Sequence, residues 1–164
     1  MSMNEEQFIK RDRMRFAKNA LSSGLALLAI LFNVFYFVSI YKSDVGSFYY
    51  NILIGASILY NLIFMLTVFL CSEGVKSYSS TYAYVLLAVG LLQIVRIFIL
   101  PMRAHTATAT INQQETIVMQ TAQFLRVVAY LVASAVCCLV AGVVGIQKSR
   151  VLAAHMAALK QKAA

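Results

Sequence analysis

Four long apolar segments limit the fold of this 164-residue chain more than any other feature of the sequence. They cover residues 21–41, 48–71, 81–101 and 124–146. A helix of roughly 20 residues crosses a hydrocarbon core of about 30 Å, and each segment reaches that length. Backbone groups inside a bilayer must hydrogen-bond within the protein, so helices are the structure expected here. The sequence predicts an all-α membrane protein built as a bundle of four transmembrane helices.

The composition agrees with a chain that lies in a lipid bilayer. Hydrophobic residues make up 61% of it and charged residues only 12%, which is too apolar for the surface of a soluble protein. The formal net charge of +8 could suggest a nucleic-acid partner. The basic residues flank the apolar segments, however, and this position suits anionic headgroups at a membrane surface. We therefore expect the lipid bilayer as the main partner and no nucleic acid.

The distribution of Lys and Arg predicts the orientation of the four helices. Basic residues concentrate on the cytoplasmic side of membrane proteins. With both termini in the cytoplasm, ten basic residues fall on that side: Lys10, Arg11, Arg13, Arg15, Lys18, Lys76, Lys148, Arg150, Lys160 and Lys162. The opposite loops hold only Lys42 and Arg103. Short tails and compact loops favour the cytoplasmic membrane of a bacterium as the location.

The chain divides into a transmembrane domain and two charged ends. Residues 1–19 form a cytoplasmic N-terminal helix or tail, residues 20–147 the four-helix domain, and residues 148–164 a basic cytoplasmic helix that continues the fourth span. The first apolar segment is longer than the core of a cleaved signal peptide, so we expect it to be a spanning helix. Each end is either a solvated extension or a site for a specific partner.

The connection at 103–123 is the only sizeable extracytoplasmic element that the sequence predicts. Thr106, Thr108 and Thr110 alternate with apolar neighbours, and β-favouring residues follow a polar Asn-Gln-Gln. This alternation is typical of a short β-hairpin between the third and fourth helices. An irregular loop lying on the membrane is the alternative.

Small residues recur along the fourth helix in two adjacent rows. Small side chains allow helix backbones to approach closely, which is a common basis of helix association in membranes. The rows are either the internal packing face of the bundle or a surface for self-association or for a partner subunit. They consist of Ala129, Ala133, Cys137, Ala141 and Gly145, and of Ser134, Cys138 and Gly142.

Four amide side chains lie within the first three spans: Asn33, Asn51, Asn61 and Gln93. An amide in contact with lipid is unfavourable, so we expect them to face inward and to hydrogen-bond across helices. They are either structural contacts between helices or the lining of a hydrated polar path.

Arg96 is the most unusual residue, because it lies inside an apolar span. It could extend to the headgroups, as long basic side chains often do. Helical side chains lean toward the N-terminus, however, and for the third helix this means toward the membrane interior. A buried Arg96 would need hydrogen-bond partners. The candidate site for an anion or a lipid headgroup then consists of Arg96, Gln93, Arg103, His105 and Arg126.

The sequence offers no recognisable catalytic or metal site. No Asp or Glu falls inside a predicted span, and the two histidines, His105 and His155, fall on opposite sides of the membrane. The three cysteines, Cys71, Cys137 and Cys138, lie in or beside apolar segments, where a reactive thiolate is disfavoured. We expect no enzymatic activity, cofactor or bound metal.

Two functions are compatible with these features. The first is a non-catalytic accessory or scaffold subunit that self-associates, or binds another membrane protein, through the small-residue face of the fourth helix. The second is a small oligomeric transporter, channel, or lipid- or anion-binding protein that uses Arg96 and the intramembrane amides, with an anionic lipid as a possible ligand.

Overall fold

The computed structural model describes residues 18–40, 48–106, 108–111, 114–117 and 119–163. Side chains are outside that description at 48–54, 108–111, 114–117, 160 and 162–163. The elements are α2 (Ala20–Ile40), α3 (Phe48–Lys76), α4 (Ser80–Ile99), α5 (Pro101–Thr106), β1 (Thr108–Ile111), β2 (Gln114–Ile117) and α6 (Thr121–Ala163).

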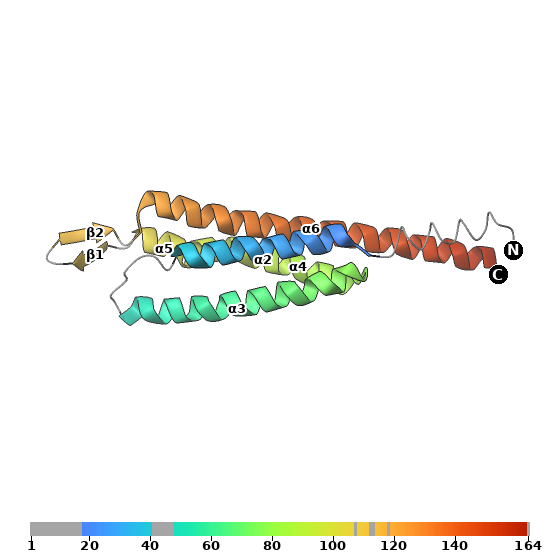
Figure 1. Cartoon of the computed structure of the whole chain (residues 1–164), viewed down its shortest axis with the longest axis horizontal. Helices are drawn as coiled ribbons and strands as arrows, with labels where there is room; N and C mark the ends of the chain where they lie inside the picture. Colours follow the sequence, from blue (N-terminus) through green and yellow to red (C-terminus); the bar gives the residue numbers. More distant parts are fainter. Residues whose placement is uncertain (1–17, 41–47, 107, 112–113, 118, 164) are drawn as a thin grey trace.

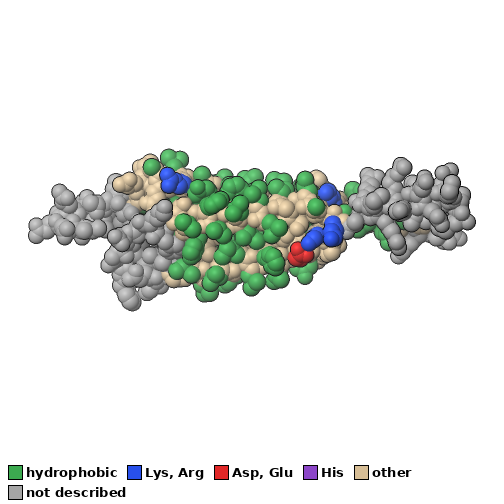
Figure 2. Space-filling model, in the orientation of Figure 1, with side chains coloured by type: hydrophobic (Ala, Val, Ile, Leu, Met, Phe, Trp, Pro, Cys, Tyr) green, Lys and Arg blue, Asp and Glu red, His purple; other side chains and the backbone are tan. Residues whose placement is uncertain are grey.

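The protein contains four helices that are long and apolar enough to cross a membrane, by length and composition. Large apolar side chains cover their outward faces, and Leu66, Phe98 and Leu125 are each more than 60% exposed. In Figure 2 these side chains form a band along the four-helix body, with Lys and Arg at its two ends. Such a band suits hydrocarbon rather than water, so the predicted membrane-spanning helical bundle is confirmed at this level.

The four long helices run alternately up and down (Figure 1). Helix α2 packs against α3 and α6, and α4 packs against the same two neighbours. This is the arrangement that short connections between successive helices favour. Helix α6 is longer than the others and extends well past the rest of the bundle at its C-terminal end.

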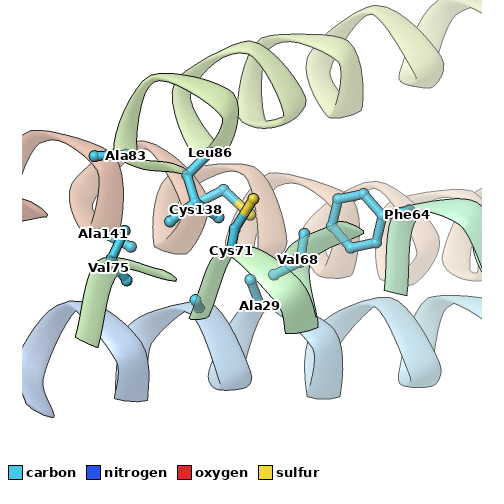
Figure 3. Close-up of a cluster of buried hydrophobic side chains, with 10 residues drawn as sticks. Ala29, Phe64, Val68, Cys71, Val75, Ala83, Leu86, Cys138 and Ala141 are labelled. Atoms are coloured by element: carbon cyan, nitrogen blue, oxygen red, sulfur yellow. The ribbon is translucent and has the colours of Figure 1, made fainter. Parts of the chain in front are cut away.

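Buried residues recur at spacings of three and four along each helix. This spacing is typical of the packing face of helices in a left-handed bundle. On α3 the buried set is Ser57, Asn61, Phe64, Val68, Cys71 and Val75. Figure 3 shows the centre of the core, where Val68 and Cys71 of α3 meet Ala29 of α2 and Leu86 of α4. The core therefore consists mostly of small and medium side chains.

Helices α4 and α6 make a close contact at the two glycines of α6. A Cβ atom added to Gly142 would lie 2.7 Å from Leu87 Cγ and 2.8 Å from the carbonyl oxygen of Ala83. One added to Gly145 would lie 2.9 Å from the Cβ of Ala83. Only a residue without a side chain fits at this distance, so the glycines determine how closely the two helices approach.

The predicted small-residue face of the fourth helix is not a single face in the structure. Ala141, Gly142 and Gly145 are buried, whereas Ala129 is exposed and Ala133 is only half-buried. Each step of four residues turns a helix by about 40° beyond a full turn, so four steps turn it by about 160°. A row at steps of four thus winds from the exterior to the interior.

The connection between α3 and α4 is a tight turn that closes one end of the bundle. Tyr78 has a φ of 62°, and its N–H donates to the carbonyl of Val75 over 3.1 Å. The Ser79 N–H donates to the carbonyl of Gly74 over 3.2 Å, which completes a Schellman motif. Ser149 of α6 donates its hydroxyl to the Tyr78 carbonyl over 2.7 Å and ties α6 to this turn.

Strands β1 and β2 pair antiparallel at the opposite end of the bundle, between α5 and α6. Thr108 pairs with Ile117, and Ile111 pairs with Gln114. Residues 112 and 113, which join the strands, lie outside the described part of the chain. The predicted hairpin, and the side of the membrane on which it lies, therefore remain predictions.

Candidate functional site

Arg96 is buried inside the bundle, with 6% of its surface exposed. Its Nη1 donates to the Oδ1 of Asn61 over 2.8 Å and to the Oδ1 of Asn33 over 3.4 Å. Its Nη2 donates to the Ser57 hydroxyl over 2.9 Å. Of the two orientations that the sequence left open, the structure has the inward one, and α2 and α3 both supply acceptors.

Two tyrosine rings flank the guanidinium group of Arg96. The Cζ atom lies 4.4 Å from the ring centre of Tyr36 on α2 and 4.6 Å from that of Tyr60 on α3. A cation over an aromatic face is attracted by the ring quadrupole, and the attraction is stronger away from water. The rings therefore stabilise the charged form of Arg96 in an otherwise apolar setting.

Gln93 extends the network to α6. Its Nε2 donates to the Oδ1 of Asn33 over 3.1 Å and to the hydroxyl of Ser134 over 3.4 Å. Ser134 in turn donates to the backbone carbonyl of Ala29 over 2.9 Å. The single oxygen Asn33 Oδ1 thus accepts from both Gln93 and Arg96. We call Asn33, Ser57, Asn61, Gln93, Arg96 and Ser134 the polar layer, and it includes residues from all four long helices.

The polar layer lies deep in the membrane-spanning part of the bundle. Arg96 precedes the end of α5 at Thr106 by ten residues, which corresponds to roughly 15 Å of helix. Helix α5 begins at Pro101 with a single residue between it and the end of α4, and the candidate span Ser80–Thr106 therefore continues past that proline. Asn33 and Asn61 also lie near the middle of their helices.

The hydrogen bonds are of the right magnitude to hold a charge at this depth. Placing an arginine at the centre of a spanning helix costs about 2.5–3.5 kcal/mol on insertion scales, and more by simulation. A hydrogen bond to a charged group contributes about 1.5–3 kcal/mol. Arg96 donates to three side-chain acceptors, so these bonds are comparable to the cost of burial.

A cavity of about 220 Å³ lies beside Arg96, between α3 and α4. Buried Arg96 and Ser57 line its polar part, together with half-buried Tyr60. The other lining residues are the apolar Ala56, Leu92, Val95, Ile99 and Leu100. Leu92, Val95 and Ile99 are each at least 50% exposed on the outer surface. The cavity therefore has a cationic floor and apolar walls that reach the lipid-facing surface.

The polar layer also contains three polar atoms without a hydrogen-bond partner among the described residues. They are the Nδ2 atoms of Asn33 and Asn61 and the Oε1 atom of Gln93. All three side chains are fully buried. A polar atom left unsatisfied in a protein interior costs about 1–3 kcal/mol. These atoms give the layer additional capacity to bind a polar group or water.

The other predicted anion-site residues are not among the hydrogen-bond partners described for Arg96. Arg103 and Arg126 are exposed on α5 and α6. The Nδ1 of His105 lies 3.1 Å from the carbonyl oxygen of Met119, and its ring stacks on Phe124 with centroids 4.6 Å apart. His105 thus packs against the start of α6. The buried face of α5 consists of Pro101 and Ala104, so Arg103 does not share the orientation of Arg96.

Of the intramembrane amides, Asn33, Asn61 and Gln93 are buried and belong to the polar layer, whereas the side chain of Asn51 lies outside the described part. Sequence reasoning missed Ser57, Tyr36 and Tyr60. A signal was present, because Ser57 precedes Asn61 by four residues and Tyr36 follows Asn33 by three. These spacings put each pair on one helical face.

The remaining candidate chemistry is weak. Cys71 and Cys138 are buried in the apolar core and Cys137 is half-buried, and all three are free thiols. Within the described ranges, no group of three or more His, Cys, Asp or Glu residues is placed to hold a metal ion.

Comparisons with protein-family models, with curated proteins and with solved structures found no match for this chain.

Proposed function

We propose that this protein is a membrane-embedded binding protein for an anionic ligand, which is bound by Arg96 at the floor of the cavity between α3 and α4. The observation that carries the proposal is the position of the guanidinium group. It is buried and already oriented by three uncharged side chains, and it lines a cavity with apolar walls. A carboxylate or a phosphate would form charge-assisted hydrogen bonds with it.

Preorganisation supports binding over a purely structural role. The Arg96 side chain is held between Tyr36 and Tyr60 and by its acceptors, so little side-chain entropy remains to be lost when a ligand binds. A pocket with mostly apolar walls and a few convergent polar groups is also typical of a small-molecule site.

We also infer that the end of the bundle with Lys18, Lys76, Lys148 and Arg150 faces the cytoplasm of a bacterial cell. These residues lie at the start of α2, the end of α3 and the cytoplasmic continuation of α6. Arg103 and Arg126 lie toward the opposite end, where β1 and β2 are located. The bias in basic residues supports this orientation. The cavity then lies in the part of the bundle between the polar layer and the outer surface.

Thermal unfolding of the protein in mild detergent tests the anion site. Phosphatidic acid and oleate probe lipid anions, inorganic phosphate probes a free anion, and phosphatidylcholine serves as the net-neutral control. At a concentration of a hundred times Kd, an occupied site raises Tm by roughly 5–11 °C in a protein of this size. We expect a saturable rise with at least one anion and none with phosphatidylcholine.

Two arginine variants complete this test. Arg96→Gln should abolish the rise, whereas Arg126→Gln, which removes an exposed arginine, should retain it. An equal rise in both variants, or no rise with any anion in the unaltered protein, would contradict the proposal. Stabilisation by phosphate alone would indicate a free anion as the ligand, and stabilisation by oleate or phosphatidic acid would indicate an amphiphile.

A second candidate function is self-association, or association with a partner subunit, through the exposed half of α6. A groove of about 540 Å³ lies between α2 and α6. It is lined by Phe32, Leu125, Val128, Ala129, Val132, Ala133, Val136 and Cys137. This part of the small-residue row remains available to another helix, whereas Gly142 and Gly145 are used inside the bundle.

Native mass spectrometry of the gently solubilised protein tests this candidate. Ala133→Leu fills the groove and should shift the protein toward the monomer or remove a co-purifying subunit. Ala154→Leu makes the same substitution at an exposed position of α6 outside the groove and is the matched control. If Ala133→Leu leaves the mass unchanged, the groove is not an association surface.

A further inference from the structure

The cavity beside Arg96 has an apolar side that reaches the outward face of α4. Its apolar walls are formed by Leu92, Val95 and Ile99, successive residues on the outward face of α4. Helices α3 and α4 pack together less extensively than α4 and α6 do. The α3 lining residues Ala56, Ser57 and Tyr60 belong to the first half of α3, which diverges from the rest of the bundle in Figure 1. A ligand can therefore reach Arg96 sideways along this seam.

The shape of the cavity restricts the ligand to an amphiphile. Its polar floor consists of Arg96, Ser57 and Tyr60, and the rest of the lining is apolar. The volume of about 220 Å³ accommodates a small headgroup and the first part of one chain. The remainder of a chain would lie along the exposed Leu92, Val95 and Ile99, where it would still contact apolar surface.

The depth of the floor favours a carboxyl headgroup over a phosphate. Arg96 precedes the exposed Arg103 of α5 by seven residues, which corresponds to roughly 10 Å of helix, and the cavity around it has apolar walls, so a ligand headgroup passes apolar side chains to reach it. A phosphate monoester carries about −1.5 to −2 charges at pH 7 and keeps charge along that route. A carboxylic acid can enter uncharged, because an apolar environment favours the neutral acid. On ionisation beside Arg96, its proton returns to the aqueous phase.

We propose that the ligand is a single-chain carboxylate amphiphile of the fatty-acid class, which enters from the membrane between α3 and α4 and places its carboxylate on Arg96. This inference rests on the proposed anion site and adds the headgroup, the chain number and the route of entry. A carboxylate can accept two parallel hydrogen bonds from a guanidinium group. The acyl chain lies against the α4 wall of the cavity.

A tryptophan reporter can locate the chain directly, because the sequence contains no tryptophan. Ile99→Trp introduces a single fluorophore in the cavity wall. Leu31→Trp introduces one on α2 close to Asn33, at an exposed position outside the cavity lining. The ligand probe is dibromostearate, a fatty acid whose bromine atoms quench tryptophan fluorescence on contact, and the protein is reconstituted in phosphatidylcholine nanodiscs.

We expect saturable quenching of the Ile99→Trp variant that excess unlabelled oleate reverses. The Leu31→Trp variant should show only the weak, unsaturable quenching of a fatty acid dissolved in the bilayer. Adding Arg96→Gln to Ile99→Trp should remove the saturable part, and adding Arg126→Gln should not. Reversal by oleate does not depend on any arginine variant, so the test holds even if Arg96→Gln fails to fold.

Equal quenching at the two positions, or quenching that oleate does not reverse, would overturn the inference. A parallel titration with phosphatidic acid carrying brominated chains separates this failure from failure of the anion site. If only phosphatidic acid quenches saturably and depends on Arg96, the site binds an anion but the carboxylate assignment is wrong. If neither probe depends on Arg96, the anion site itself is refuted.

Discussion

The two halves of the bundle differ in how closely their helices pack. In the half that ends at the α3–α4 turn, α4 and α6 approach so closely that Gly142 and Gly145 have no room for a side chain. In the half toward α5, the helices are linked by the polar layer, and a cavity separates α3 from α4. Close packing leaves no space for a ligand. Hydrogen bonds between long side chains can hold helices together across a larger gap.

Both halves still share one hydrophobic pattern. Buried positions follow spacings of three and four throughout, so the helices keep the same faces inward in each half. The difference lies in the residue type at those positions. Small residues of α6 allow the close approach in the closed half, where Ser23 and Ser72 also hydrogen-bond across helices over 2.8 Å, whereas Arg96 and its partners lie in the hollow half.

Substitution of Gly142 by leucine should have the largest effect, because a side chain at this position prevents α4 and α6 from approaching closely. The added Cβ would lie 2.8 Å from a backbone oxygen of Ala83, which cannot move away without displacing α4. We expect a loss of about 3 kcal/mol or more, seen as a fall in Tm of roughly 6–12 °C in detergent.

Gly24→Leu is the matched control for this change. Gly24 lies in α2, and a Cβ added there meets nothing within 4 Å. It should leave Tm nearly unchanged. If both variants lose the same stability, the closed half is not defined by glycine packing.

Substitution of Asn61 by leucine should have the next largest effect, in the hollow half. It removes the acceptor 2.8 Å from Arg96 Nη1 and leaves a buried charge short of one partner. A hydrogen bond to a charged group contributes about 1.5–3 kcal/mol, so we expect a loss in that range in chemical or thermal unfolding.

The double variant Arg96→Leu with Asn61→Leu sharpens this prediction. Replacing both members of a buried polar pair by apolar residues is often close to neutral. The double variant should therefore be more stable than Asn61→Leu alone. Additive losses would mean that Arg96 and Asn61 do not act as a pair.

Substitution of Ser134 by alanine should have the smallest effect of the three. It removes the acceptor for Gln93 and the hydrogen bond to the carbonyl of Ala29, but no charge is left buried. Interhelical hydrogen bonds in membranes contribute about 0.6 kcal/mol on average and about 1.7 at most. The free energy of unfolding should fall by about 1 kcal/mol, and no more than the Asn61→Leu variant loses.

Helix length and inward-facing amides were predictable from the sequence. Spans of some 20 apolar residues allow little but helices, and Asn33, Asn61 and Gln93 are each buried because lipid contact is unfavourable for an amide. Arg96 is also buried rather than extended to the headgroups, as the lean of helical side chains toward the N-terminus of their helix favours.

Two features of the site could not be read from the sequence. The spacing of Ser57 and Asn61 puts both on one helical face, but serine is common in spanning helices, and only the position of Arg96 in space identifies Ser57 as its acceptor. The row from Ala129 to Gly145 appeared continuous because it repeats every four residues. The inward-facing positions of the bundle repeat every seven residues. A row that repeats every four therefore rotates away from them, and its first part faces outward.

The length of α6 has a mechanical consequence. The helix is continuous from Ser134 in the polar layer to Ala163, and about 21 Å of it extends past the Ser149 contact that marks the end of the bundle. A rod held at such a contact works as a lever. A tilt of α6 by about 5° would move its C-terminal end by roughly 2 Å. A small rearrangement around Gln93 and Ser134 that tilts α6 would therefore displace the part of the helix beyond Ser149.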